Sequence, residues 1–406
     1  MRADAITLIS RQRLRGSVDG SSAYLLSLCA AMRDAGFRLH LVSPTPAAFG
    51  RWPAIWLGGE MAMFDTIAMR GAWRLGRLVV ARDPRVLLGA TYAVVGSVLR
   101  RAGLRGWRST PAAYAIGLPV SDADRRFVAR HAPAGAAAVI ADYAFLTELI
   151  AYAPARRSLV VMHDLFSSRP AQFARVGCAD STRCVTEEEE LRMLARAGCV
   201  VAIQPEEAAL VARRLPGTLV IDVPMAVRPV AAPQPGVGGV LLVGSGAAPN
   251  VDAVAWLLSS IWPRVRQALP DALLTIAGAA GLSVGKAPEG VRILGRVGDL
   301  APLYRDMAVV VAPLRAGSGL KVKLIEALGH GKAVVATEVT MQGVSEAARN
   351  AVIIADDPAV FAQAIVALLR DPAARRRLAT AALAVARTHH APEACSRALI
   401  ETLRTS

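Results

Sequence analysis

The sequence of 406 residues has few lysines, few cysteines and no long apolar run. Its five cysteines are odd in number and mostly lie in apolar segments, which is typical of reduced thiols and excludes a disulfide framework. No apolar run approaches the roughly 20 residues needed to cross a membrane. The first residues do not resemble a signal peptide, because most of their arginines follow the apolar segment. We therefore expect a cytoplasmic protein.

Metal-binding patterns are missing too. No group of histidines and cysteines has the spacing of a metal site, so we expect neither a metal nor a cofactor. The acidic run Glu187–Glu190 is better explained as the first turn of a helix with a solvated face, because carboxylates there meet the positive end of the helix dipole.

The chain also has few acidic residues for its number of basic ones, and its formal net charge is +15. Residues 1–230 hold 29 basic and 19 acidic residues, a difference of +10, so the N-terminal half carries most of the excess. This charge suits nucleic acid, a phosphorylated substrate or an anionic membrane, although a basic solvated surface explains it equally well. Nucleic acid is the weakest candidate, because the basic residues are not interleaved with exposed aromatic residues.

What is present is an alternation of apolar strands and helices, which predicts an α/β protein with parallel sheets. The first unit runs from the strand "AITLIS" through a loop with glycines and a helix to the strand "FRLHLVSP", whereas residues 50–135 give no clear boundaries. Prolines and glycines between Pro224 and Gly239 mark a linker. We predict a Rossmann-like N-terminal domain over 1–227 and a Rossmann-like C-terminal domain over 228–390, with a ligand bound between them.

The clearest chemical signal is "AVVVAPLRAGSGLKVKLIEALGHGKAVVAT" (308–337), which holds three of the four lysines. A strand, a glycine-rich loop and a helix start offer backbone N–H groups and a positive dipole end to an anion. Lys321 and Lys323 lie in the first turn, where a cation is unfavourable unless an anion is bound; two solvated lysines are the alternative. Glu326 would pair with Lys323 or bind a ribose, and Lys332 is interpreted as a favourable charge after the helix. The segment predicts a nucleotide or nucleotide-sugar site.

The segments "GVLLVGSGAAPN", "VRILGRVGD" and "GSGLKVKLIEALGHG" together resemble the nucleotide-sugar domain of family 4 retaining glycosyltransferases, which have the GT-B fold. The resemblance covers about residues 239–372. The N-terminal half is similar more loosely, through its first glycine-bearing loop and the run "HDLFSSR". The resemblance implies two Rossmann-like, doubly wound domains facing across a cleft, with a final helix over 391–406 that returns to the first domain.

The resemblance also implies the donor site, in which Glu326 would bind the ribose while Lys321 and Lys323 hold the diphosphate. The implied donor-binding residues are Gly244, Ser245, Asn250, Arg296, Val297, Gly317, Ser318, Gly319, Leu320, Lys321, Lys323 and Glu326. Two departures stand out. Ser318 replaces a glutamate that many members carry eight positions before the ribose-binding one, and "GSGAAPN" lacks the Arg and Lys pair that many members have after the first strand of this domain.

In the first domain, His163 and Asp164 end a strand, where Rossmann-like sheets place functional side chains. We predict these two residues and Lys321 as catalytic, with Asp164 either orienting His163 or capping the next helix. A glycine-bearing loop before the first helix is expected to approach the phosphates or the acceptor; the alternative is a surface turn in which Ser21 or Ser22 caps that helix. The acceptor-side loop residues are Gly16, Gly20 and Ser21.

The sequence thus predicts a hexosyltransferase of polysaccharide or glycolipid biosynthesis. It would move a sugar from a nucleotide-sugar donor to a hydroxyl of a glycan or lipid-linked acceptor, with retention and without a metal, since lysines would neutralise the leaving diphosphate. The basic first domain is expected to contact an anionic membrane at its inner face. A nucleotide-sugar epimerase of the same fold and a catalytically silent nucleotide-sugar-binding protein remain the alternatives.

Overall fold

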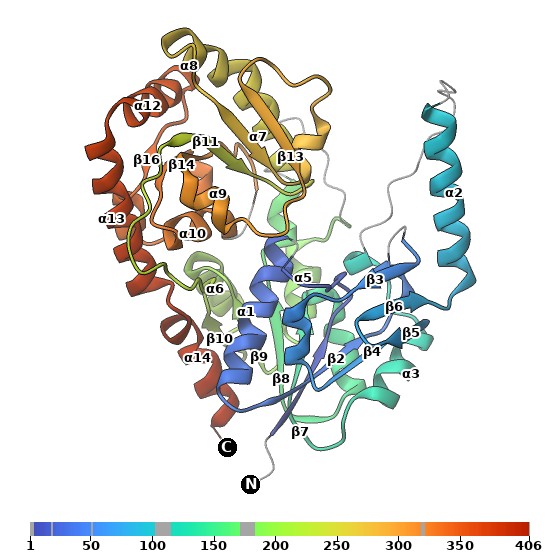
Figure 1. Cartoon of the computed structure of the whole chain (residues 1–406). Helices are drawn as coiled ribbons and strands as arrows, with labels where there is room; N and C mark the ends of the chain where they lie inside the picture. The colour runs from blue at the N-terminus through green and yellow to red at the C-terminus, as the bar shows by residue number, and fades with distance from the viewer. Residues whose placement is uncertain are drawn as a thin grey trace.

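The computed structural model describes residues 4–17, 19–49, 52–101, 115–170, 183–317 and 321–405. They form two α/β domains, each built on a parallel sheet with helices on both faces (Figure 1). This is the doubly wound architecture that the alternation of strands and helices predicts. Among the described helices, none combines the length and apolar character needed to cross a membrane.

The N-terminal domain contains a seven-stranded sheet in the order β10-β9-β8-β7-β1-β2-β4, and every pair in it is parallel. The strand order reverses between β1 and β7, so the loops after these strands diverge and leave room for a ligand. The strands are β1 Ala5–Ile9, β2 Arg38–Ser43, β4 Thr66–Met69, β7 Ala136–Asp142, β8 Ala155–Met162, β9 Cys199–Ala202 and β10 Leu219–Asp222.

Capping boxes start several helices of this domain. Thr186 caps the helix that opens with four glutamates, as the acidic run predicts. The first helix is capped by Asp19, whose carboxylate accepts from the backbone N–H of Ser22, so neither Ser21 nor Ser22 is the cap considered above. The helices are α1 Gly20–Asp34, α2 Pro84–Arg101, α3 Asp122–His131, α5 Glu187–Leu194 and α6 Pro205–Arg214.

Residues 52–101, whose pattern predicts no clear boundaries, contain strand β4 of the large sheet and a small antiparallel sheet, followed by α2. The sheet has the order β3-β6-β5. Its strands are β3 Ala54–Trp56, β5 Ala72–Leu75 and β6 Leu78–Ala81. Figure 1 shows α2 projecting from the body of the domain beside this sheet.

The C-terminal domain contains a six-stranded parallel sheet in the order β13-β12-β11-β14-β15-β16, with its reversal between β11 and β14. Buried valines and leucines fill its central strands, as expected for a sheet covered on both faces. The strands are β11 Gly238–Val243, β12 Leu274–Ala277, β13 Val291–Gly295, β14 Met307–Ala312, β15 Ala333–Ala336 and β16 Ile353–Ile354.

Helices cover both faces of this second sheet. The helix predicted from Asn250 to about Leu269 is α7 and α8 joined by a π-helical turn, Leu257–Ile261. The helices are α7 Ala248–Trp256, α8 Trp262–Ala268, α9 Ala301–Asp306, α10 Val322–Gly329, α11 Glu346–Asn350, α12 Pro358–Arg370, α13 Pro372–His389 and α14 Pro392–Arg404. Short 3-10 helices cover Pro46–Phe49, Gly59–Met63, Ala115–Gly117, Ala144–Tyr152, Phe166–Ser168, Ala279–Ser283 and Glu338–Met341.

The chain crosses between the domains twice, once after β10 and once between α13 and α14. The two crossings are tied together, because Val227 N–H donates to the carbonyl of His390 at 2.8 Å and the His390 ring lies 3.0 Å from the carbonyl of Met225. Helix α14 then packs against α1 of the N-terminal domain (Figure 1). Gly329 lets the first crossing lie close to α10, since a Cβ there would lie 2.5 Å from the Val227 side chain.

Lys332 fixes the same crossing. The sequence interpretation of Lys332 as a simple charge after the helix is wrong, because the residue is fully buried. Its ammonium group donates to the carbonyl of Met307 at 2.5 Å and to the carbonyl of Gln234 in the linker. Burial lowers the pKa of Lys332 to about 8. This lysine joins the linker to the start of β14.

Candidate functional site

The carboxyl ends of the two large sheets face each other, and residues from both domains meet there. Lys321, after β14, lies close enough to Glu207 and Asp164 of the N-terminal domain for their charges to act on it. Gly20, at the start of α1, lies against Val322 of α10; a Cβ there would be 3.5 Å from the valine side chain. In each sheet, the point where the strand order reverses therefore faces the other domain. Parallel sheets bind their ligands at this point.

The glycine-bearing loop after β14 leads into α10. Gly317 has φ +131°, a backbone conformation that side-chain-bearing residues rarely adopt, so the loop needs glycine there. Lys321 is the residue preceding α10, and its ammonium group donates to the carbonyl of Gly317 at 3.1 Å. Ser318, Gly319 and Leu320, which the resemblance also assigned to the donor site, lie outside the described residues.

Lys323 and Glu326 lie on the first turns of α10 and form an ion pair, with Nζ 2.8 and 3.0 Å from the two carboxylate oxygens. The nearer of these oxygens, Oε2, also accepts from the hydroxyl of Tyr304 at 3.4 Å. Tyr304 is buried and stacks on His330, with ring centroids 4.5 Å apart. Glu326 is thereby held in one orientation while its side chain stays 20% exposed. It is available to accept hydrogen bonds from a hydroxylated ligand.

The loop after β11 lies beside the loop after β14. The amide of Asn250 donates to the hydroxyl of Ser245 at 3.0 Å, and Gly244 packs against the side chains of Asn250 and Ala280. Pro249 in turn approaches Gly317 of the second loop. The backbone of Gly244 and Gly317 and the side chains of Ser245 and Asn250 thus belong to one region at the β11–β14 reversal.

Arg315 carries a positive charge into this region but is held by its neighbours. Its guanidinium group forms a two-point ion pair with Asp252, with Nε 2.9 Å from one oxygen, and lies over the ring of Trp256 at 5.7 Å. This arrangement fixes the loop after β14 to α7.

A cluster of arginines spans the two domains, and the sequence interpretation did not single it out. Arg13 follows β1, and Arg296 follows β13 beside Val297. The pKa of Arg13 is lowered, first by burial and then by the charges of Arg15 and Arg296. Three like charges brought together across a domain boundary suit an anion placed between them. The signal available in the sequence was the spacing of arginines in "RLRG" directly after the first strand.

A buried carboxylate organises the N-terminal side of the site. Asp142 ends β7 and is fully buried; it accepts from the hydroxyl of Ser10 at 2.5 Å and from the amide of Gln12 at 3.0 Å. The ring N–H of His163 donates to the other oxygen of Asp142 at 2.7 Å. His163 thus follows β8 as predicted, but Asp142 orients it and Asp164 does not; Asp164 lies 3.4 Å from Arg169.

The His163 ring is enclosed by aromatic side chains. It stacks on Tyr143 with centroids 4.1 Å apart and meets the edge of Tyr24 at 5.5 Å. Tyr143 has φ +74°, a strained value for a residue with a side chain. Such strain is found where surrounding structure enforces it, often at functional sites. The packing fixes which ring nitrogen of His163 faces Asp142 and leaves the other one for a ligand.

Glu207 and Lys321 meet across the domain boundary as a buried acid and a half-buried base. Burial, together with the nearby charge of Asp164, raises the pKa of Glu207 to about 8. Burial also lowers the pKa of Lys321 to about 8, against the opposing effect of Glu207 and Asp164. One carboxylate oxygen of Glu207 accepts from Leu165 N–H at 3.3 Å, and the other has no hydrogen-bond partner among the described residues. This pair was not predicted, since Glu207 reads only as a helix-start acid.

The predicted acceptor-side loop lies between β1 and α1. Gly16 has φ +136°, and the next residue, Ser17, binds Glu60 through both its backbone N–H and its hydroxyl. Gly20 faces α10 as described above, whereas Ser21 lies half-buried in the first turn of α1. No group of three or more metal-ligating side chains occurs within the described ranges. The two closely spaced aspartates Asp122 and Asp124 do not change this, because the carboxylate of Asp124 forms ion pairs with Arg11 at 3.0 Å and Arg70 at 2.7 Å.

Comparison with solved structures defines the class of fold. TarM from S. aureus, solved as a point mutant with Fondaparinux, alpha-GlcNAc-glycerol and UDP, is 9% identical with a TM-score of 0.66, covering 99% of this chain and all of that one. HepE from Anabaena, solved with UDP and glucose, is 15% identical with a TM-score of 0.58 and the same coverage. These likenesses extend over both domains, and the fold is GT-B, as the resemblance implied.

Residues 238–371 match the family model described as Glycosyl transferases group 1. These residues include the loops after β11, β13 and β14 and the start of α10. A Klebsiella pneumoniae protein, described as an uncharacterized 44.6 kDa protein in cps region, is 27% identical over 139 residues. That match covers 31% of this chain and 36% of the relative, so the chain matches about a third of the relative's length.

Proposed function

We propose that the protein is a glycosyltransferase that moves a sugar from a nucleotide-diphosphate donor to a hydroxyl of a glycan or lipid-linked acceptor. The observation that carries the proposal is the convergence at the β11–β14 reversal of a glycine-bearing loop, the helix start with Lys321 and Lys323, and Glu326. These groups lie in the segment that matches the glycosyl transferases group 1 model. A phosphate-binding and a ribose-binding group three to five residues apart suit a sugar nucleotide.

The diphosphate would lie at the start of α10, between Lys321 and the arginine cluster of Arg13, Arg15 and Arg296. Negative charge builds up on the departing diphosphate in the transition state, and fixed cations and backbone N–H groups stabilise it most where water is excluded. Arg13 and Arg15 would supply the charge that the "GSGAAPN" loop lacks. This arrangement supports transfer without a metal.

His163 would contact the transferred sugar or the acceptor hydroxyl through the ring nitrogen that does not face Asp142. Asp142, which accepts from the other ring N–H, would hold the ring in the orientation that this contact requires. We propose a retaining outcome from the resemblance to family 4. We also propose UDP as the first nucleotide to test, since the TarM and HepE structures contain it.

The first prediction concerns Glu326. The substitution Glu326→Gln removes a charge-assisted acceptor from the proposed ribose site, so UDP should bind at least tenfold more weakly, a loss of about 1.5–3 kcal/mol. Isothermal titration calorimetry of the full chain with UDP measures this. Glu346→Gln, at an exposed acid on α11, is the matched control and should bind as the wild type does.

Turnover distinguishes the proposed reaction from its rivals. Incubation with UDP-sugars should release UDP slowly even without acceptor, and the release should fall in Glu326→Gln. A changed sugar still attached to the nucleotide would instead identify an epimerase. Tight UDP binding without any release, across a panel of sugar nucleotides and glycan acceptors, would identify a silent binding protein.

A further inference from the structure

The small sheet β3-β6-β5 exposes an apolar face to solvent. Residues paired directly across antiparallel strands lie on the same face, and the register pairs Trp56 with Leu78, Leu78 with Leu75, and Val80 with Trp73. Trp56, Trp73 and Leu75 are 63%, 59% and 69% exposed. We call this surface the aromatic face; it comprises Ala54, Trp56, Trp73, Leu75, Leu78 and Val80.

The opposite face of the same sheet packs on the domain. Ile55, Val79 and Ala81 alternate with the residues of the aromatic face and are each at most 2% exposed. A sheet with one buried face normally has polar residues on the other. Here every side chain of the outward face is apolar, and a contiguous apolar patch of this kind indicates an interaction surface.

Arginines lie at the rim of the aromatic face. The guanidinium group of Arg77 lies 6.0 Å from the Trp56 ring centre, and that of Arg82 lies 5.9 Å from the Trp73 ring centre. Between residues 66 and 82 the chain has four arginines and no acidic residue. Tryptophan beside arginine is the combination that proteins place at the boundary between lipid headgroups and acyl chains.

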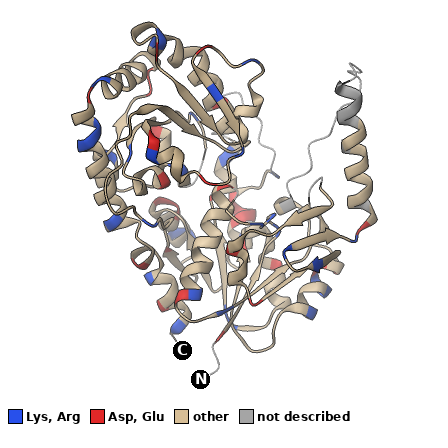
Figure 2. Ribbon diagram, in the orientation of Figure 1, with Lys and Arg blue, Asp and Glu red and all other residues tan. Residues whose placement is uncertain are grey.

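Helix α2, which follows β6 after two residues, adds further exposed apolar side chains. Between Val86 and Leu99 the sequence has no charged residue, and the described part of the projecting helix is uncharged in Figure 2. The side chains of Leu88, Tyr92 and Val94 are each more than half exposed. The helix thus extends the apolar surface beyond the sheet.

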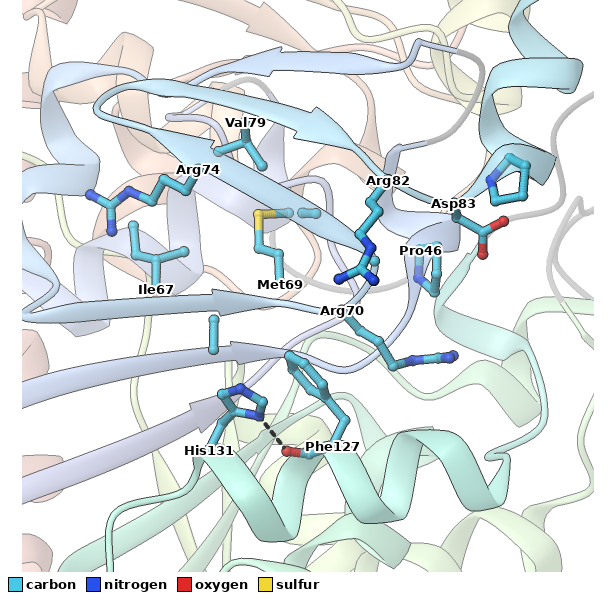
Figure 3. A pocket seen from close by; sticks show the side chains of 14 residues that line it. Pro46, Ile67, Met69, Arg70, Arg74, Val79, Arg82, Asp83, Phe127 and His131 are labelled. Atoms are coloured by element: carbon cyan, nitrogen blue, oxygen red, sulfur yellow. Dashed lines mark hydrogen bonds between the residues drawn. The ribbon is translucent and has the colours of Figure 1, made fainter.

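A pocket lined by arginines lies under the β5–β6 hairpin, between it, β4 and α3 (Figure 3). Its volume is about 810 Å³, and Arg70, Arg74 and Arg82 line it together with His131 and a single acid, Asp83. Arg82 also lies over Trp73 and so connects the pocket with the aromatic face. In the described chain, no carboxylate forms an ion pair with Arg74 or Arg82.

We infer that the aromatic face docks on an anionic phospholipid surface, with the arginine-lined pocket binding a headgroup phosphate. Burial of the tryptophans and leucines in the interface supplies apolar free energy, and the arginines supply charge complementarity. A glycan fits the aromatic face less well, because the face has no carboxylate, amide or hydroxyl side chain to orient sugar hydroxyls. A second copy of the chain fits less well too, since a two-fold contact would bring the rim arginines together.

This inference does not depend on the proposed sugar transfer, because it is tested by binding alone. Full-length protein is sedimented with vesicles of equal parts phosphatidylglycerol and phosphatidylcholine, and with vesicles of phosphatidylcholine only. We expect binding to the anionic vesicles that weakens with salt, accompanied by a blue shift of tryptophan fluorescence. Glycerol phosphate in solution should compete with the anionic vesicles, since the pocket is inferred to bind the headgroup phosphate; an absence of competition would overturn that role of the pocket.

Two variants locate the contact. Trp56→Ser with Trp73→Ser should lower the partition coefficient at least tenfold, since interfacial binding scales with the apolar area buried. Arg77→Gln with Arg82→Gln should lower it about fivefold for each arginine removed. Leu273→Ser and Arg376→Gln, at exposed positions in the C-terminal domain, are the matched controls and should bind as the wild type does.

All of these substitutions are at exposed positions, and an unchanged melting temperature should show that each variant is folded. Equal sedimentation of the tryptophan variant and the wild type would overturn the inference. A dimer in solution that the tryptophan variant abolishes, without vesicle binding by the wild type, would overturn it in favour of a second copy. Binding to acidic oligosaccharides but not to vesicles would overturn it in favour of a glycan site.

Discussion

Lys321, which the sequence singles out, and Glu207, which it does not, acquire unusual chemistry where the two domains bring them together. The lysine precedes α10, and the glutamate lies in the first turn of α6. Burial disfavours the charged form of each side chain, so it raises the pKa of Glu207 and lowers the pKa of Lys321. An anionic ligand would favour the charged lysine, so nucleotide binding and proton uptake should be coupled.

Nucleotide affinity should therefore depend on pH through Lys321. The pKa of this lysine in the free protein is about 8, so above pH 8 UDP must bind together with a proton and its Kd should rise, by up to about tenfold per pH unit. The terminal phosphate of UDP, which ionises near pH 6, does not contribute in this range. Lys321→Arg should keep its charge, so only the deprotonation of Glu207 remains and the Kd should rise less steeply than in the wild type; calorimetry between pH 7 and 9.5 measures both profiles.

Lys286→Arg is the control for that measurement, since Lys286 is an exposed lysine in the loop before β13. Its profile should match the wild type. A pH-independent Kd in the wild type would show that Lys321 does not take part in phosphate binding.

Glu207 makes a separate prediction about stability. Its folded-state pKa of about 8 lies above the ordinary value of 4.5. Between these two pH values, Glu207 keeps its proton in the folded protein but has lost it in the unfolded chain. The resulting stabilisation is present below pH 4.5 and is lost as the pH rises through 8, by roughly 1.4 kcal/mol per pH unit at most. Glu207→Gln should remove this dependence and become relatively more stable toward pH 8.

Thermal unfolding from pH 5 to 8.5, compared between the variant and the wild type, checks this sign. The neighbouring Glu206→Gln is the matched control, because Glu206 is exposed. A constant difference in melting temperature between Glu207→Gln and the wild type across the range would contradict a raised pKa.

At the scale of elements, the predictable parts are those whose pattern is local. Strands such as β14 and β15 are continuous apolar runs, and only a sheet covered on both faces uses such runs at this length. The ion pair of Lys323 and Glu326 is likewise local, because residues three apart share a helix face. Both were visible in the sequence.

Other elements could not be predicted because their pattern is unusual or their partners are distant. Apart from Arg74, the sheet β3-β6-β5 is apolar on both faces, so it lacks the regular alternation that identifies a strand. The hydrogen bond of Ser10 to Asp142 joins residues 132 positions apart. The meeting of Glu207 with Lys321 depends on how two domains pack, which no local pattern encodes.

Lys332 provides the prediction at this scale. The substitution Lys332→Met keeps the aliphatic stem but leaves the carbonyls of Gln234 and Met307 without their buried donor, so it should destabilise the protein by roughly 2–4 kcal/mol. Chemical denaturation followed by circular dichroism measures the free energy of unfolding. Lys286→Met, at an exposed lysine, should change it by less than about 0.5 kcal/mol.

At the scale of the whole molecule, the carboxyl ends of the two large sheets face each other. The proposed reaction takes place between them, at a site to which both domains contribute side chains. The cations at the proposed diphosphate site come from both domains: Arg13 and Arg15 from one, Arg296 and Lys321 from the other. The aromatic face lies on the N-terminal domain alone. A docked N-terminal domain would leave the C-terminal domain free to move.

The two chain crossings determine what kind of movement that is. Because Val227 and His390 join the crossings side by side, a rotation of one domain relative to the other would have its pivot there. Such a rotation would open the boundary as a wedge, narrow at the pivot and wide on the far side. Substrates would therefore enter and leave from the side opposite the pivot.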